Sequence, residues 1–411
     1  MPEPIGERMV TPTRGWDIEL TIKDKDYSAD LYRVRVITSI TLPYQTILLD
    51  IFIDQNDIIL DKMYGQDKIK LSIRLLEQNS RSVKQQDDFE LMYITSHYPL
   101  IMKAKNSQGF ENERVPVSIV AVPREAFKTA TTIVNKIYLE KTSKQVIEDL
   151  VKSFTKAKIE YDSDGANPLV IDQTIVPPKP LIKAITYMDE TFGLFSGPFV
   201  QFIDKDNKLF VINLNKKFNK NQTFTIYQMA LDAVEEETLK KCVDGKNFYT
   251  YETFESHYSG NTKFTTLAKK QKFIVKPRDT LSYTIEHDLS TIMKKNALIF
   301  KNSKSYTDSI IDNRERVYSN HTGYDKDENF AIAGTTPSLS NMSGLSVQLE
   351  KNLPILRLME VGRIVKVNSN MQDITDLTGK YILKSSDLVW DRSGEWEGVA
   401  TLSLIRSNKT I

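Results

Sequence analysis

The clearest pattern in the chain is a helical stripe followed by two short apolar runs, between residues 179 and 214. Apolar side chains recur at the spacing of one helix face from Leu181 to Phe192, after a proline-rich start that suits a first helical turn. Gly193 stands where a helix usually stops. The two apolar runs that follow are separated by four polar residues. We therefore predict a helix over 181–192 and a β-hairpin over 199–214.

A second helix is indicated earlier in the chain. Residues 132–140 read as a strand, and the sequence then changes to Thr142-Ser143-Lys144-Gln145. A threonine with a glutamine three positions later is the signature of a capping box at a helix start. The apolar stripe that follows predicts a helix over about 143–156.

Both ends of the chain alternate between apolar and polar residues, as strands do. The odd-numbered apolar residues from Ile47 to Ile53 share one face, so one side of their sheet should be buried. Further strands are expected at 31–40, 68–73, 89–98 and 115–122, and near the end at 356–367, 379–390 and 396–406. Repeated strands with short turns predict small β-barrels or sandwiches, and a faint likeness links the two ends.

Three other segments differ from these strands and helices in composition. Residues 1–14 are rich in proline and read as an extended arm. Residues 230–242 read as a short helix, with glutamates early and lysines late, as the helix dipole favours. Residues 301–353 are rich in Ser, Asn, Asp and Gly and predict a polar loop or insertion outside the β-core.

Composition indicates several globular domains and no special partner. The chain has 411 residues, of which 55 are basic and 54 acidic, so net charge gives no argument for nucleic acid or a charged membrane. Cys242 is the only cysteine, which favours a reducing compartment. The start lacks the apolar core of a signal peptide, and no run reaches the roughly 18 apolar residues of a membrane span. We expect folding in a cytoplasm and no membrane insertion.

Signatures of catalysis and of cofactor binding are missing from the sequence. The four histidines, His97, His257, His287 and His321, are far apart, and one cysteine cannot complete a zinc site with them. No zinc-protease, P-loop, dinucleotide-binding or nucleophile-elbow motif occurs. The acidic turn at 162–165 does not have the spacing of a calcium loop. We therefore expect no catalytic, cofactor-binding or metal-binding residues, and no enzyme activity.

The densest aromatic cluster lies at 248–258 and has two interpretations. Its members are Phe248, Tyr249, Tyr251, Phe254 and Tyr258. They could stack on a sugar or a single-stranded nucleic acid. Packing within strands is the simpler interpretation, because aromatic residues favour strands and no basic run accompanies the cluster.

The order of these parts resembles the central hub proteins of contractile-tail phage baseplates. A β-domain comes first, the capped helix and the helix–hairpin unit follow, and the chain closes on GKYILKSSDLVW and TLSLIR. The layout is also similar to the amino-terminal part of type VI secretion spike proteins. The match is closest at 142–214 and 360–406.

The resemblance implies a mainly β fold with α+β insertions, containing two small β-domains that are similar to tail-tube subunits. The expected division is an arm over 1–14, a first tube-like β-domain over 15–123, an α+β connecting domain over 124–229, a second tube-like β-domain over 230–300 and 354–411, and the polar insertion over 301–353. Three chains would then supply six β-domains, forming a pseudo-sixfold ring between a sixfold tube and a threefold spike.

The resemblance also implies the partners and the location of the protein. The partners would be two further copies of the chain, a central spike protein, a tail-tube or tube-initiator protein, and beyond these the tape-measure protein and the baseplate wedge. Genomic DNA would pass through the channel without specific binding. The protein would belong to the virion tail baseplate and be assembled in the cytoplasm of a bacterial host.

Two other functions compete with this structural role. One is a tail-associated hydrolase of cell wall or glycan, and the other is a carbohydrate-binding module that uses the aromatic cluster at 248–258. The missing motifs favour the hub over the hydrolase. The oligomeric state distinguishes the hub from a monomeric module.

Overall fold

The structure is a computed structural model. It describes residues 15–40, 42–54, 68–76, 83–97, 114–162, 166–195, 199–213, 222–228, 247–250, 255–257, 272–277, 285–288, 316–320, 343–349, 361–369 and 378–406. The predicted arm over 1–14 and the predicted helix over 230–242 lie outside these residues.

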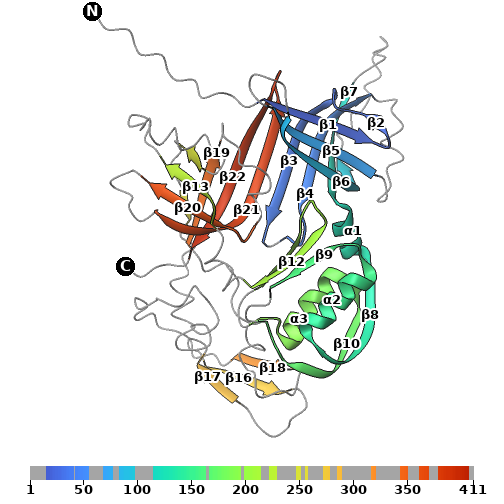
Figure 1. The fold of residues 1–411 in the computed structure, drawn as a ribbon, viewed down its shortest axis with the longest axis vertical. Coiled ribbons are helices and arrows are strands. Elements are labelled where there is room, and N and C mark those ends of the chain that lie inside the picture. The colour runs from blue at the N-terminus through green and yellow to red at the C-terminus, as the bar shows by residue number, and fades with distance from the viewer. Residues whose placement is uncertain are drawn as a thin grey trace, which may run out of the picture.

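One large sheet contains strands from both ends of the chain (Figure 1). Its amino-terminal strands are β1 (Trp16–Ile22), β2 (Lys25–Asp26), β3 (Leu31–Ser39), β4 (Thr46–Asp54), β5 (Lys68–Leu76), β6 (Val83–His97) and β7 (Arg114–Pro123). Its later strands are β13 (Gln222–Gln228), β14 (Asn247–Thr250), β15 (Glu255–His257), β19 (Ser343–Leu349), β20 (Ile364–Ser369), β21 (Gly379–Arg392) and β22 (Trp396–Arg406). The main strand order is β14-β13-β20-β21-β3-β4-β7-β6-β5-β1-β2.

Strand β21 joins the two ends of the chain. Its first residues pair with β20, and from Ser385 onward it pairs antiparallel with β3, while β22 lies along its other edge. Two ion pairs cross the β3–β21 seam. The Arg35 guanidinium contacts both oxygens of Asp387 at 2.7 and 2.5 Å, and Arg33 Nε donates to Asp391 at 2.5 Å. Because the arginines are nearly half exposed, these pairs add more to register than to stability.

The large sheet is curled around one hydrophobic core. Trp16 of β1 packs edge-on against Trp390 of β21, with ring centroids 5.5 Å apart, although five strands separate β1 and β21 in the sheet order. One buried cluster includes the predicted face of β4 together with Leu402 and Leu404 of β22. Alternation in the sequence therefore identified the inner face correctly, and both ends of the chain share that core.

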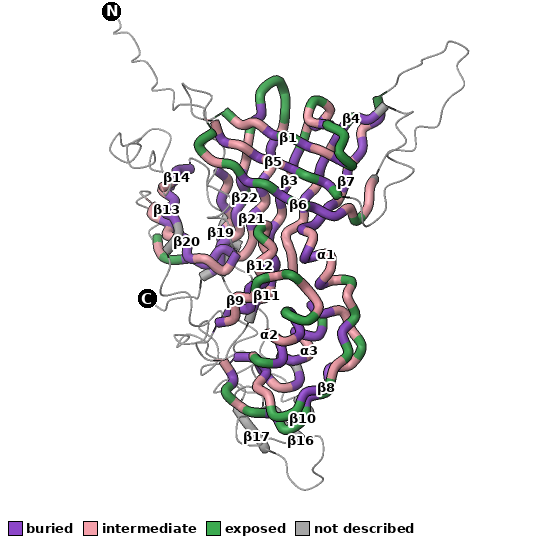
Figure 2. Tube along the Cα trace, turned by 45° about the vertical axis from the view of Figure 1, so that its right-hand side comes forward, coloured by how far each residue is buried: buried purple, intermediate pink, exposed green. Residues whose placement is uncertain are grey.

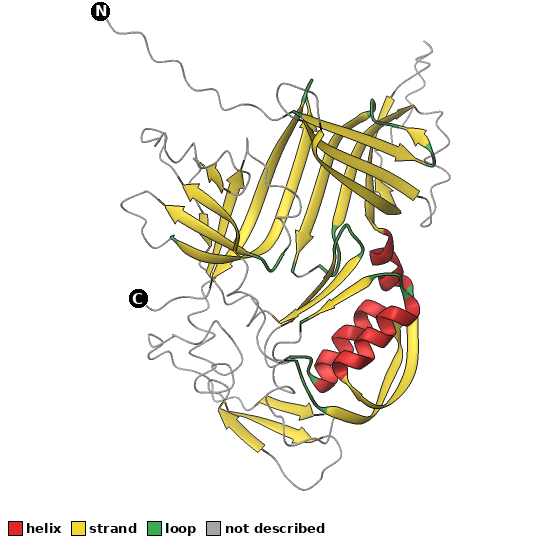
Figure 3. Cartoon of the chain, viewed as in Figure 1, coloured by secondary structure: helices red, strands yellow, loops and turns green. Residues whose placement is uncertain are grey.

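The connecting domain lies beside this sheet and has its own core (Figure 3). It contains α1 (Arg124–Thr131), β8 (Ile133–Thr142), α2 (Ser143–Phe154), β9 (Lys158–Tyr161), β10 (Val170–Pro180), α3 (Leu181–Phe192), β11 (Phe199–Ile203) and β12 (Lys208–Asn213). Strands β8 and β10 form a two-stranded ribbon that curves around α2 and α3, while β11, β12 and β9 form a three-stranded sheet. A separate small sheet holds β16 (Lys272–Pro277), β17 (Ile285–Asp288) and β18 (Arg316–Asn320).

The local predictions for the connecting domain are confirmed. Helix α2 begins with a full capping box, in which the Thr142 side chain accepts from the Gln145 N–H and the Gln145 side chain accepts from the Thr142 N–H. Helix α3 spans the predicted residues and ends at Gly193, whose φ of 71° is easiest for glycine. The predicted hairpin is β11 and β12. The broader prediction of a mainly β fold with helical insertions is confirmed as well.

The prediction for the polar segment is wrong at residues 343–349. Residues 301–353 were expected to lie outside the β-core, but β19 within them pairs with β22 along its whole length. Leu345, Val347 and Leu349 are buried in the large core. The alternation that marks a strand is present in Ser343–Leu349, but the polar residues around it masked the signal.

Candidate functional site

The described residues contain no group of three or more His, Cys, Asp or Glu that could hold a metal ion. The backbones of His97, His257 and His287 lie in β6, β15 and β17, whereas His321 and Cys242 lie outside the described residues. The expected lack of catalytic, cofactor and metal residues therefore stays a prediction. No helix in the described part of the chain is long and apolar enough to cross a bilayer.

The described part of the aromatic cluster lies in the core. Phe248 and Tyr249 belong to β14 and are buried, and the Phe248 ring packs edge-on against Phe224 of β13 at 5.6 Å. Tyr251, Phe254 and Tyr258 lie outside the described residues. A stacking platform needs exposed ring faces, so Phe248 and Tyr249 serve packing rather than ligand binding.

A buried ion pair joins the turn of the β11–β12 hairpin to β6 of the large sheet. Lys205 Nζ lies 3.2 Å from Asp87 Oδ1 of β6 and 2.9 Å from Asp206 Oδ1, and the side chains of Lys205 and Asp87 are only 10% and 4% exposed. Asp87 also accepts from Gln85 Nε2 at 2.8 Å. Burial acts to lower the pKa of Lys205, but Asp206 and Asp87 outweigh it and raise that pKa.

The same turn is tied to α1 through Asn207. Asn207 Oδ1 accepts from the Glu125 N–H at 3.2 Å, and the Asn207 carbonyl accepts from the Lys158 N–H at 3.1 Å. The Glu125 carboxylate accepts from Lys128 Nζ at 2.7 Å and from the Lys156 N–H at 2.9 Å. The turn therefore joins the large sheet, α1 and the start of β9. The sequence identified a tight turn here and no further role, because its main partner, Asp87, is remote in the sequence.

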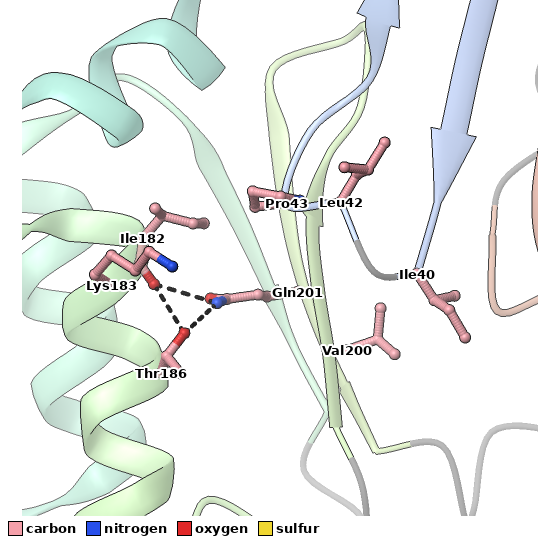
Figure 4. A pocket seen from close by; sticks show the side chains of 8 residues that line it. All are labelled: Ile40, Leu42, Pro43, Ile182, Lys183, Thr186, Val200 and Gln201. Carbon is pink, nitrogen blue, oxygen red and sulfur yellow. Dashed lines mark hydrogen bonds between the residues drawn. The ribbon is translucent and has the colours of Figure 1, made fainter. Parts of the chain in front are cut away.

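A pocket of about 230 Å³ lies at a second contact between the sheet and the connecting domain (Figure 4). Near the pocket, the Ile203 N–H donates to the Pro43 carbonyl at 3.0 Å, and Tyr44 forms an isolated parallel β-bridge with Ile203. The pocket is lined by Ile40, Leu42 and Pro43 from the β3–β4 loop, Ile182, Lys183 and Thr186 from α3, and Val200 and Gln201 from β11. Apolar side chains and the polar side chains of Lys183, Thr186 and Gln201 therefore line the pocket together.

Many residues of the β8–β10 ribbon are exposed (Figure 2), and several of them are apolar. Ile133, Ile137 and Leu139 of β8 and Val170 and Ile175 of β10 are each 50–65% exposed, whereas Val134, Tyr138 and Val176 pack inward. Gathered apolar side chains of this kind are typical of interaction surfaces. The sequence analysis predicted the strand at 132–140 but not which of its faces is exposed.

The inner face of the ribbon is joined to α2 by a polar contact. Asp149 of α2 accepts from Lys136 Nζ at 2.6 Å and from the Tyr138 hydroxyl at 2.9 Å. The bond to Lys136 is the main cause of a lowered pKa at Asp149, and burial is the main cause of a raised pKa at Tyr138.

Comparison with known proteins matches this fold to phage tail proteins. The family model described as the bacteriophage PBS1 gene 109 protein matches residues 69–239. Among curated proteins, none matches this sequence. A tail protein from Neisseria meningitidis MC58 has a similar structure, with 9% identity and a TM-score of 0.57, over 95% of this chain and 97% of that chain.

Two further solved structures have the same fold. The 43 kDa tail protein of prophage MuSo2 from Shewanella oneidensis is 11% identical, with a TM-score of 0.52, over 95% of this chain and 97% of that chain. A chain of the half-lidded Francisella PdpA–VgrG complex is 12% identical, with a TM-score of 0.52. The match covers 99% of this protein and 60% of that chain. The resemblance to phage tail proteins that the sequence predicted is confirmed at the level of the fold.

Proposed function

We propose that the protein is the central hub of a contractile phage tail baseplate, a structural component that joins the tail tube to the central spike. The observation that carries the proposal is the pairing of β3 with β21, which sets the strands of both chain ends side by side in one sheet. Two β-units held together in each chain are what a pseudo-sixfold ring of three chains requires. The match to a tail protein over nearly its whole length supports the same role.

In this proposal, the two tube-like domains are residues 15–123 and residues 230–300 with 354–411. The second domain also takes in β13 and β19, which pair with β20 and β22, and it leaves out β16 and β17, which lie in the separate small sheet. Three copies form a closed ring, as is usual for homo-oligomers, and the ring lines a channel through which genomic DNA passes. The connecting domain over 124–229, without β13, lies outside or below the ring. Each exposed strand edge gains a neighbour in a closed ring, which limits open-ended aggregation.

The proposed partners are the central spike protein and a tail-tube or tube-initiator protein, with the tape-measure protein and baseplate wedge nearby. Solved complexes that contain VgrG are among the proteins of similar fold, which supports a spike-type neighbour. The proposed location is the tail baseplate of a virion, after assembly in the cytoplasm of a bacterial host.

Cryo-electron microscopy of the chain, alone and with its spike, tests the ring directly. We expect a threefold ring in which two β-domains of each chain alternate around the channel. An even-fold ring of whole chains, or a channel lined by one β-domain per chain, would contradict the proposal. Native mass spectrometry should give the mass of three chains in the same preparations.

We also propose that the protein has no hydrolase activity of its own. The sequence motifs for a nucleophile, a metal or a phosphate loop are missing, and the described residues offer no metal-binding group. Purified protein should release no soluble fragments from peptidoglycan sacculi. Release that is lost when a single carboxylate is changed to its amide would establish the enzyme instead.

A further inference from the structure

The pocket between the β3–β4 loop and α3 has the size of a protein side chain. Its volume of about 230 Å³ is below the roughly 300–1,000 Å³ of most small-molecule sites. Apolar side chains, among them Leu42 and Pro43, line it together with Lys183, Thr186 and Gln201, so the pocket suits an apolar side chain that has a polar neighbour.

The polar side of the pocket is held in a fixed arrangement before anything binds. Gln201 Nε2 donates to the Ile182 carbonyl at 3.2 Å and to Thr186 Oγ1 at 2.8 Å. A carbonyl can only accept, so the nitrogen of the Gln201 amide must face α3. The other amide atom, Gln201 Oε1, receives no hydrogen bond from the described residues. A site that is held in place in advance loses less entropy when a partner binds.

Lys183, the charged residue at the rim of the pocket, has no ion-pair partner within the described residues. Lys183 is exposed on α3, and its side chain points from the helix toward β11 in Figure 4. Lys128, Lys136 and Lys208 of the same domain are each paired with a carboxylate, whereas Lys183, like Lys152, has no carboxylate partner among the described residues. A positive charge beside an apolar pocket complements an apolar side chain that has a carboxylate next to it.

We propose that this pocket is a docking site for a protein partner that inserts one medium-sized apolar side chain and places an adjacent Asp or Glu on Lys183. The inference rests on the proposed function only in taking that partner to be a neighbouring tail protein. The apolar side chain fills the pocket, and the carboxylate sets which segment is accepted.

The test uses a synthetic peptide and isotope-labelled methyl groups of the full chain. The probe is acetyl-Gly-Asp-Leu-Asp-Gly-amide, and its matched control replaces both aspartates with lysine. We expect saturable shifts at the methyl groups of Ile40, Leu42, Ile182 and Val200, with a Kd on the order of 1 mM for so small a ligand. The lysine peptide should bind about two- to fivefold more weakly, and the difference should shrink in high salt.

A pair of variants isolates the role of the rim charge. Lys183→Glu should reverse the preference between the two peptides, because it replaces the attraction for aspartate with repulsion. Lys152→Glu is the matched control, since Lys152 is also an exposed lysine on a helix but does not line the pocket. It should leave both affinities unchanged.

Three outcomes would overturn the inference. They are equal binding of both peptides, shifts confined to residues outside the pocket, and no saturable shift at all with the aspartate peptide. None of these peptide-binding measurements depends on ring formation. A monomeric chain that prefers the aspartate peptide would support the docking site even if the trimer proposal failed.

Discussion

The connecting domain and the large sheet differ in how far apart in the sequence their contacting residues lie. In the connecting domain, the helices pack on strands next to them in the chain, and β11 and β12 are joined by a turn of four residues. In the large sheet, Arg35 and Asp387 are 352 positions apart. Local contacts close small loops, whereas distant ones form only after a large loss of chain entropy. The sheet therefore depends on cooperative burial more than the connecting domain does.

The largest expected effect is the introduction of a charge into the shared core. Leu402 is fully buried and pairs with Val347 of β19 and Ser386 of β21. Leu402→Lys should abolish folding of the sheet, because an isolated ion in an apolar core is extremely costly. Amide exchange should show loss of protection in β3 as well as in β19, β21 and β22.

The control for this variant is Thr401→Lys, on the exposed side of the same strand. It should remain within about 0.5 kcal/mol of the parent protein in urea unfolding. Protection retained in β3 after Leu402→Lys would show that the two ends of the chain fold independently.

A smaller effect is expected at the joint between the two regions. Lys205→Met removes the cation beside the buried Asp87 carboxylate, and leaving a buried charge unpaired costs about 3–5 kcal/mol. Lys205 has a raised pKa, so its native form holds the proton more tightly than the unfolded chain does. Its contribution should be complete below the unfolded lysine pKa of about 10.4 and be lost as pH rises through the native value.

Urea unfolding at pH 7 and at alkaline pH measures both parts of this prediction. The matched variant Lys152→Met removes an exposed lysine and should have little effect at either pH. An equal cost for Lys205→Met and Lys152→Met would show that the hairpin turn does not stabilise the joint.

The next effect concerns only the connecting domain. Thr142→Ala removes the side chain that accepts from the Gln145 N–H at the start of α2. Loss of such a cap costs about 1 kcal/mol. Thr142→Ser keeps the hydroxyl and should recover most of the stability in thermal unfolding. No difference between the two variants would mean that the capping box adds nothing measurable.

The smallest effect is expected on the outer face of the ribbon. Ile137 is 58% exposed, so Ile137→Asn should change the free energy of unfolding by about 0.5 kcal/mol or less. Val134→Asn, on the inner face of the same strand, should cost about 1–3 kcal/mol, because it buries an amide without partners. Similar costs for both variants would show that the ribbon has no free face.

The sequence was informative about the helices and the hairpin, and much less so about the site. The capping box at Thr142 and the end of α3 at Gly193 depend on neighbouring residues, so both were predictable. The pocket was not, because Ile40 and Ile182 belong to segments that meet only in the folded chain. The ion pair of Lys205 and Asp87 had no local signal for the same reason.

By itself, the sequence determined α2 and α3, the β11–β12 hairpin, many of the strands and the buried face of β4. Those features depend on periods of a few residues, on caps and on turn-forming residues. Only the tertiary structure decided that β21 pairs with β3 and that β19 enters the same sheet. Many alternating strands satisfy the same local rules. Their order is therefore chosen by which arrangement buries every inner face at once, and that is a property of the whole chain.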